Sequence, residues 1–244
     1  MSSEFRRHDV EWTPEKVARF WDWLSTFPPE AYFSHHSGGA ILDFVARHVP
    51  LEGRVLDYGC GAGYLIEHLL GRGVHVHGLD FSGSSVERVR ARFASRPNFE
   101  GATHVIELPS ALPAGTFDMV TCIEVIEHLP DAWLESTLLE LSRLLRPGGT
   151  LVVTTPNDEK LEANRTMCPD CGGVFHNYQH VRSWNAARLE HALAGRGFRT
   201  IACEATNFSD PAPSLLRRLA RRLRGQVVAQ PHLSFVGRKG GTTP

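Results

Sequence analysis

The sequence VLDYGCGAG, at residues 55–63, has three alternating glycines directly after a short apolar run. Glycine allows a tight turn and lets a ligand approach the backbone closely. A carboxylate, Asp80, ends the next apolar run, 23 residues after Asp57, where it can hold two ribose hydroxyls. Because the spacing is G-x-G-x-G and not G-x-G-x-x-G, we predict a nucleotide-type site in which a dinucleotide pyrophosphate is less favoured.

Two carboxylates and an imidazole follow another apolar run, in the sequence CIEVIEH at residues 122–128. Glu124, Glu127 and His128 are spaced i, i+3, i+4, so a helical turn would bring all three to one side. Such a set can bind a divalent metal ion. The same set can instead remove a proton from a hydroxyl group of a substrate, with His128 as the base and the glutamates in support.

The sequence MCPDCGGVFHNYQH, at residues 167–180, has the spacing C-x2-C-x4-H-x3-H. Two thiolates in a tight turn, followed by glycine, are typical of a zinc knuckle, and two histidines would complete a tetrahedral site. The predicted zinc ligands are Cys168, Cys171, His176 and His180. The alternative is a loop with two reduced cysteines and no metal.

His180 has three candidate roles, and it can fill only one of them. It can be the fourth zinc ligand, a further ligand beside the two glutamates, or the general base that faces the acceptor. In one arrangement Cys168, Cys171 and His176 hold zinc together with another ligand, and His180 faces the acceptor. Both the ligand role and the acceptor-facing role stay open at this point.

Strands and helices must position these residues, and the apolar periodicity predicts that the two alternate. Strands are predicted at 54–58, 74–80, 104–108, 117–123, 150–155, 198–205 and 232–237. Helices are predicted at 14–27, 38–48, 64–70, 83–94, 131–145, 185–196 and 214–225. Short strands joined by helical crossovers form parallel pairs, so the predicted fold class is α/β, a doubly wound sheet with helices on both faces. No repeat or low-complexity linker divides the chain, and residues 1–244 are predicted to form one domain.

Four ordered motifs, VLDYGCGAG, GLDFS, FDMVTCIEVIEHL and LRPGGTLVVTTPN, resemble those of class I S-adenosylmethionine-dependent methyltransferases, over about residues 40–200. The resemblance implies a Rossmann-like sheet of seven strands with the last one antiparallel, and S-adenosylmethionine as cofactor. The implied cofactor contacts are Asp57, Gly59, Cys60, Gly61, Gly63, Asp80, Phe81, Leu108 and Cys122. Among them, the glycines would pass under the methionine part, Asp57 would orient the loop or meet the amino group, Asp80 would bind the ribose and Phe81 would flank the adenine.

On the acceptor side the chain resembles the ubiquinone-biosynthesis O-methyltransferases, which use a similar Glu-Glu-His triplet for a divalent ion. It also resembles the small-RNA 3′-end 2′-O-methyltransferases, which add a later histidine. In metal-free relatives the acids line the cofactor pocket instead, and the histidine forms a polar wall. The aromatic residues of segment 1–50 resemble the helical lid of the family, and segment 161–184, with its CPxCG turn, would be a zinc-knuckle-like insertion.

The sequence therefore predicts an enzyme that methylates a hydroxyl group by in-line transfer from S-adenosylmethionine. The acceptor would be a small molecule, a saccharide or a lipid-linked intermediate. The predicted catalytic residues are His128, Glu127 and His180, and the predicted metals are zinc and, in one interpretation, a second divalent ion at Glu124, Glu127 and His128. Two alternatives are an RNA ribose 2′-O-methyltransferase and a non-catalytic cofactor-binding partner subunit.

Composition and charge narrow the class of protein and its partners. The chain of 244 residues is 42% hydrophobic, enough for a sizeable core, and its formal net charge is −1. No apolar run approaches the roughly 20 residues of a membrane span, and the start lacks the apolar stretch of a signal peptide. Five cysteines form no disulfide framework, so a cytoplasmic protein with reduced thiols is expected.

The charge is divided unevenly along the chain. Residues 211–244 contain six Arg, one Lys and no acid, giving +7, so the first 210 residues carry −8. Binding to nucleic acid is therefore not expected of the chain as a whole. A basic amphipathic segment at 211–231, with a leucine-striped helix at 214–225, has two interpretations: peripheral contact with a membrane, or a solvated surface helix packed on the sheet. The sequence does not indicate an oligomeric state.

Overall fold

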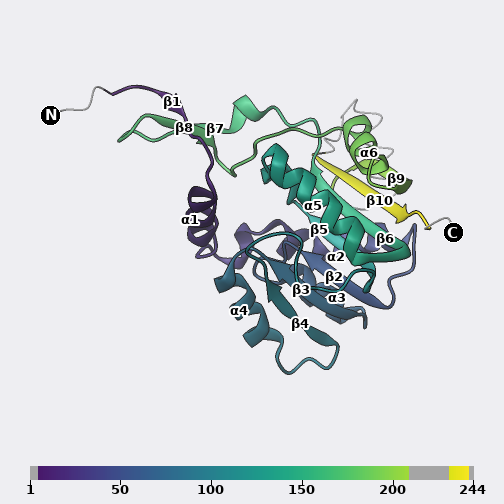
Figure 1. Ribbon diagram of the computed structural model, residues 1–244. Coiled ribbons are helices and arrows are strands. Elements are labelled where there is room, and N and C mark those ends of the chain that lie inside the picture. Colours follow the sequence, from purple (N-terminus) through teal and green to yellow (C-terminus); the bar gives the residue numbers. More distant parts are fainter. Residues whose placement is uncertain (1–4, 209–230, 242–244) are drawn as a thin grey trace, which may run out of the picture.

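A computed structural model describes residues 5–208 and 231–241 of the chain (Figure 1). Its main sheet has seven strands in the order β4-β3-β2-β5-β6-β10-β9. The strands are β2 Arg54–Tyr58, β3 His75–Asp80, β4 Phe99–His104, β5 Phe117–Ile123, β6 Leu145–Pro156, β9 Phe198–Thr206 and β10 His232–Lys239. The pairs among β2, β3, β4, β5 and β6 are parallel, whereas β10 runs antiparallel to both β6 and β9. The doubly wound α/β fold with an antiparallel last strand is confirmed.

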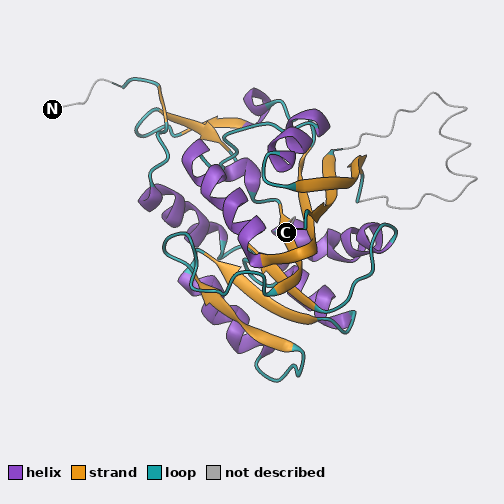
Figure 2. Ribbon diagram, turned by 45° about the vertical axis from the view of Figure 1, so that its right-hand side comes forward, coloured by secondary structure: helices purple, strands orange, loops and turns teal. Residues whose placement is uncertain are grey.

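Helices cover both faces of this sheet, as Figure 2 shows. They are α1 Pro14–Leu24, α2 Phe33–Ala46, α3 Tyr64–Gly71, α4 Gly83–Phe93, α5 Asp131–Leu144 and α6 Ala186–Ala194, with 3-10 turns η1 Pro29–Ala31, η2 Ile126–His128 and η3 Leu161–Asn164. The apolar side chains of α2, α3 and α4 form one core cluster, and those of α5 and α6 form a second. Burying one apolar stripe of each helix from α2 to α6 against the strands makes this layered arrangement stable, whereas α1 buries no residue.

A second, small sheet lies at the amino-terminal end of the molecule (Figure 1). Its three strands are β1 His8–Asp9, β7 Arg165–Met167 and β8 Gly173–His176, in the order β1-β8-β7. β7 and β8 form an antiparallel hairpin, and β1 pairs in parallel with β8. This hairpin occupies the middle of the segment predicted as a Cys/His insertion, and the pairing connects it to the chain just before α1.

One predicted strand is displaced. The apolar stretch at 104–108 is mostly loop, with Ile106 84% exposed, while the actual strand β4 covers the mixed sequence FEGATH. β4 is an edge strand that pairs with β3 alone, so one apolar face is enough and the sequence shows no continuous apolar run. The predicted helix 214–225 lies outside the described residues. Among the helices that are described, none is long and apolar enough to cross a membrane.

Candidate cofactor and acceptor site

The glycine loop connects β2 to α3 at the carboxyl edge of the sheet, where open α/β sheets bind ligands. The backbone N–H groups of Gly59 and Cys60 both donate to the carbonyl of Leu79, at 2.8 and 3.0 Å. This fastens the start of the loop to β3. All three glycines have positive φ, 76° at Gly59, 49° at Gly61 and 79° at Gly63, a region that L side chains rarely adopt.

The three glycines serve different purposes. A Cβ on Gly59 would lie 2.6 Å from a methyl group of Val125, and one on Gly63 would lie 2.8 Å from the ring of Phe93. Both positions are therefore closed by packing. A Cβ on Gly61 would meet nothing within 4 Å, so this glycine faces an open space that a side chain would fill.

Two carboxyl groups flank the loop, that of Asp57 buried and that of Asp80 partly buried. Asp80 accepts hydrogen bonds at 2.8 Å from the N–H of Gly61 and of Ser82. Burial nevertheless raises its pKa. Asp57 accepts a hydrogen bond of 2.9 Å from the Thr121 hydroxyl, and burial, opposed by that bond and reinforced by the charge of Asp80, raises its pKa to about 7. Asp80 is thus held rigidly beside Gly61, whereas Asp57 is enclosed beneath the loop.

The remaining predicted cofactor contacts differ in exposure. The ring of Phe81 is 47% exposed and meets Tyr58 edge-on at 6.5 Å, so it is free to stack on a ligand. Leu108 is half-buried against the core. Cys60 is buried, and Cys122 has no exposed surface at all; burial raises the pKa of both thiols. The assignment of Cys122 as a cofactor contact is therefore not supported by its position in the middle of the sheet.

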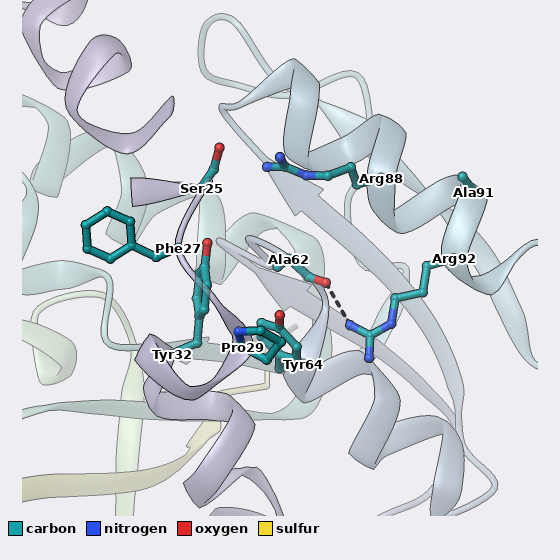
Figure 3. Close-up of a pocket in the computed structure, with 9 residues that line it drawn as sticks. All are labelled: Ser25, Phe27, Pro29, Tyr32, Ala62, Tyr64, Arg88, Ala91 and Arg92. Carbon is teal, nitrogen blue, oxygen red and sulfur yellow. Dashed lines mark hydrogen bonds between the residues drawn. The ribbon is translucent and has the colours of Figure 1, made fainter. Parts of the chain in front are cut away.

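A cavity of about 440 Å³ opens beside the glycine loop (Figure 3). Its walls come from the chain between α1 and α2, including Tyr32, from Ala62 in the loop, and from α4. Arg92 of α4 donates to the carbonyl of Ala62 at 3.1 Å and lies over the ring of Tyr64, 5.0 Å from its centroid. The amino-terminal segment and the loop therefore share one concave surface.

The acceptor side begins at η2, where Glu127 and His128 follow β5. Glu127 is 1% exposed; its Oε2 accepts a hydrogen bond of 3.0 Å from Thr155, while its Oε1 has no hydrogen-bond partner among the described residues. Nε2 of His128 lies 3.8 Å from that free oxygen. Burial, and next the charge of Glu124, raise the pKa of Glu127 well above its usual value. Burial and then His180 lower the pKa of His128 to about 3, so this imidazole is neutral.

Glu124 does not join this pair as predicted. Its φ is +52° and the 3-10 turn begins only at Ile126, so the i, i+3, i+4 spacing does not lie on one helical turn. Its carboxylate accepts a hydrogen bond of 2.8 Å from Thr154 and lies 3.7 Å from Nδ1 of His232. The predicted Glu124–Glu127–His128 triplet is therefore corrected. The side chains that do converge, with ligand atoms within 4.8 Å of one another, are those of Glu127, His128 and His180.

His180 is held by a carboxylate that the sequence did not single out. Its Nδ1 lies 2.5 Å from one oxygen of Glu159, and Nε2 of His176 lies 3.1 Å from the other. Nδ1 of His176 accepts from the backbone N–H groups of Tyr178 and His180, so its Nε2 must carry the proton that is donated to Glu159. Burial raises the pKa of Glu159, but the bond from His180 and its charge outweigh this, and the pKa is lowered overall.

Gln179 links the amino-terminal helix to the acceptor corner, the cluster formed by Glu127, His128, Glu159, His176 and His180. It is fully buried with φ of +61°, and its amide donates to the carbonyl of His128 at 2.8 Å. Its carbonyl oxygen accepts a hydrogen bond of 3.1 Å from the indole of Trp21, whose ring lies edge-on to His128 at 4.7 Å. The aromatic start of the chain therefore reaches the acceptor corner directly.

The predicted zinc set is not assembled. Among the described residues, the ligand groups that converge are Glu127 with His128 and His180, and Glu159 with His176 and His180; neither contains a cysteine. Cys168 and Cys171 lie in the turn between β7 and β8, while His176 is at the far end of β8. A strand advances about 3.3 Å per residue, which separates the histidines from the thiols. The described structure therefore does not bring His176 and His180 to the cysteine turn, and the Cys2His2 site stays a prediction.

Comparison with known proteins identifies the family. A family model described as "Methyltransferase domain" matches residues 32–202. The chain belongs to this methyltransferase family. A "Ubiquinone biosynthesis O-methyltransferase" of Aromatoleum aromaticum is 38% identical over 145 residues, 59% of each chain, and one of Chromobacterium violaceum is 37% identical over 142 residues, 57% of this chain and 58% of that protein. The chain thus matches less than two-thirds of the length of these curated relatives.

Solved structures share the fold at low sequence identity. The PH0226 protein of Pyrococcus horikoshii OT3 superimposes with a TM-score of 0.65 at 19% identity, over 89% of this chain and 98% of that one. A "Complex between the Haloferax volcanii Trm112 methyltransferase activator and the putative methyltransferase" gives a TM-score of 0.63 at 20% identity, over 91% and 98%. Membership of the methyltransferase family supports S-adenosylmethionine as the cofactor. The open space beside Gly61, with Asp80 held next to it, fits that cofactor.

Proposed function

We propose that this methyltransferase transfers the methyl group of S-adenosylmethionine to a hydroxyl oxygen of a small-molecule, saccharide or lipid-linked acceptor. One observation carries the proposal, the Glu159–His180 pair beside Glu127 and His128. A hydroxyl has a high pKa and needs help to lose its proton, whereas an amine can attack once it is neutral. An imidazole whose orientation is fixed by a carboxylate can take the proton of a hydroxyl group. The site is therefore suited to a hydroxyl acceptor.

The cofactor would lie along the glycine loop. Gly61 leaves room for its methionine part, since any side chain there would occupy the same space. Asp80 has further acceptor capacity for ribose hydroxyls, because each carboxylate oxygen can accept more than one hydrogen bond. Phe81 would stack on the adenine. When bound, the cofactor supplies an activated methyl group, and the protein has to align the acceptor oxygen with it and exclude water.

His180 would take the acceptor proton. A carboxylate only accepts hydrogen bonds, so the contact with Glu159 puts a proton on Nδ1 of His180 and leaves Nε2 with a lone pair. While the acceptor oxygen replaced the cofactor sulfur on the methyl carbon, the acceptor proton would pass to Nε2, and the negative Glu159 would stabilise the resulting imidazolium. His128 is too weak a base for this step, because burial disfavours its protonated form and so lowers its pKa.

The unpartnered atoms of the corner support a second way to activate the acceptor. Oε1 of Glu127 and Nδ1 of His128 are buried without a hydrogen-bond partner among the described residues, which is costly unless a ligand satisfies them. Glu127, His128 and His180 would hold a divalent ion there, and that ion would lower the pKa of the acceptor hydroxyl. In either case the same three side chains face the acceptor.

The amino-terminal segment would act as the lid of the acceptor site. Trp21 contacts both Gln179 and His128, and α1 has no buried residue of its own. A helix held by a few contacts can open and close at low cost. The lid would admit the acceptor and then exclude water from it.

The test is methyl incorporation from labelled S-adenosylmethionine into matched acceptors. A catechol, a sugar, a primary amine and a short RNA are offered with and without a metal chelator, each to the intact protein and to His180→Ala. We expect the intact protein to methylate a hydroxyl acceptor and His180→Ala to lose this transfer. If the chelator lowers the rate of transfer, a divalent ion takes part in activating the acceptor. Transfer to the amine alone, or to RNA with a steep decline as salt rises, contradicts the proposal. Failure to bind the cofactor by calorimetry would indicate a non-catalytic subunit.

A further inference from the structure

We propose that Cys168, Cys171 and His8 form a zinc-class metal site that fastens the amino-terminal strand to the β7–β8 hairpin. This set differs from the Cys2His2 set that the spacing predicts, because its histidine comes from the opposite end of the chain. The inference concerns a surface remote from the glycine loop and does not depend on the acceptor chemistry proposed above.

The strand pairing brings His8 to the cysteine turn. β1 runs parallel to β8 with His8 opposite Gly173, and the N–H of His8 donates to the carbonyl of Gly172 at 3.1 Å. A Cβ built on Gly173 would lie 3.4 Å from the sulfur of Cys171 and 3.8 Å from Nε2 of His8. The Cys171 thiol and the His8 imidazole therefore both lie beside the position that a side chain of residue 173 would occupy, and glycine leaves that position without one.

The two sulfurs are already together in a closed turn. The N–H of Gly172 donates to the carbonyl of Cys168 at 2.9 Å, and the N–H of Cys168 donates to the carbonyl of Gly173 at 2.8 Å. The turn from Cys168 to Cys171 therefore presents both cysteines at the same end of the hairpin. Thiolates are the form of cysteine that binds metal.

His8 has its metal-binding nitrogen free. Its Nδ1 lies 3.1 Å from the carbonyl of Arg6, and a carbonyl only accepts, so Nδ1 carries the proton and Nε2 carries the lone pair. A metal-bound histidine commonly donates its other N–H to a backbone carbonyl in this way. Of the His8 atoms, Nε2 is the one that lies nearest the Cβ position of Gly173, at 3.8 Å, so the tautomer and the direction of the ring agree.

Small side-chain rotations would complete the site. The three ligand atoms do not yet form a set within 4.8 Å, unlike the two groups at the acceptor corner. His8 and Cys171 are both exposed, and exposed side chains change rotamer within nanoseconds. Two thiolates and an imidazole are the ligands that Zn²⁺ prefers, and water would fill the fourth position. The bound ion would join residue 8, six residues before α1, to the hairpin.

The decisive experiment titrates Co²⁺ into the reduced, chelator-stripped full chain and follows the thiolate-to-cobalt charge-transfer band. This band reports sulfur ligands and is silent for an ion held by Glu127, His128 and His180. We expect one equivalent of Co²⁺ to saturate it, Zn²⁺ to displace the cobalt, and Cys168→Ser to abolish it. His8→Ala should weaken binding more than about tenfold, at least the effect of losing an outer-shell partner. Zn²⁺ should also slow hydrogen exchange at Val10, whose N–H bonds to Val174.

Matched variants separate this site from the alternatives. His191→Ala removes another exposed histidine, and Cys203→Ser removes a thiol from β9; both should titrate as the unaltered protein does. His176→Ala should also keep the band. An unchanged titration of His8→Ala would overturn the inference, and so would loss of the band in His176→Ala. Absence of any charge-transfer band at stoichiometric cobalt would remove the site altogether. Because His8 is exposed on a two-residue strand, its variant tests the site without disturbing the core.

Discussion

Nδ1 of His180 lies 2.5 Å from Oε2 of Glu159, which joins a loop after β6 to the segment that carries the proposed base. The other oxygen of the same carboxylate faces His176. One acid therefore fixes the ring orientation of two stacked imidazoles, whose planes are 17° apart at 4.4 Å. We expect this arrangement to set which nitrogen of His180 is free.

Glu159→Gln should therefore slow methyl transfer to a hydroxyl acceptor about 100-fold, in the range that loss of general-base assistance produces. It should also shift His180 from one tautomer toward a mixture, which nitrogen chemical shifts in NMR would detect without any acceptor. Glu162→Gln, on η3 with 82% of its side chain exposed, is the control. An unchanged tautomer in Glu159→Gln would refute the positioning role.

Gly61→Ala should separate backbone strain from ligand contact. Alanine at a positive φ costs about 1–2 kcal/mol of unfolding free energy, and Gly73→Ala should cost the same, since Gly73 has φ of +81° and also meets nothing within 4 Å. Only the change at Gly61 should weaken binding of S-adenosylhomocysteine, by at least about tenfold, because its Cβ occupies the cofactor space. Calorimetry on both variants decides; equal affinities would disprove the loop assignment.

Asp80→Asn should weaken the same ligand by about 10- to 100-fold, since hydrogen bonds from ribose hydroxyls to a charged acceptor contribute about 1.5–3 kcal/mol. Asp43→Asn, on the exposed side of α2, should leave the affinity unchanged. Binding is measured by calorimetry at one pH and ionic strength. If Asp80→Asn binds as tightly as the unaltered protein, the ribose is held elsewhere.

Trp21→Ala should impair the lid while the cofactor site stays intact. The variant loses the hydrogen bond to Gln179 and the contact with His128, so proteolysis within α1 should accelerate and acceptor turnover should fall. Trp23→Ala, on the same helix with 58% exposure, removes an equal volume from the solvent side. Similar proteolysis rates for both variants would count against the lid.

His128 should make the metal-free protein less stable in acid. Its pKa is about 3 in the folded chain and near 6.5 when unfolded, so the unfolded state binds the proton first. The resulting stability is fully present above pH 6.5 and is lost as the pH falls from there toward 3. Between pH 7 and pH 5 this loss amounts to about 2 kcal/mol. Chemical denaturation in chelator should find a smaller loss in His128→Gln, and an unchanged one in the exposed-site variant His191→Gln.

Periodicity in the sequence predicted the central strands well and the site only in part. β2 and β5 begin and end where predicted, because each is a short apolar run bounded by polar or turn residues. Edge strand β4 was displaced since it needs only one apolar face. The i, i+3, i+4 spacing misled because it presumes a helical turn, whereas the backbone at Glu124 is left-handed.

Residues that act across distant segments left no local signal. Glu159 and His180 are 21 positions apart, and Trp21 and Gln179 are 158 apart. No window of sequence contains either pair, and only the packing of the insertion against η2 and α1 brings them together. Likewise, the spacing around Cys168 pointed to nearby histidines, while the strand pairing selected His8.

The place of β10 in the main sheet has a consequence for biosynthesis. This last strand inserts between β6 and β9, so a nascent chain that has reached Thr206 can pair β4 through β6 but leaves the outer edge of β6 open. An unpaired apolar strand edge is a site of aggregation. Translation of residues 232–239 is therefore the step that closes the sheet, and chaperones that shield β6 until then should improve the yield of this enzyme.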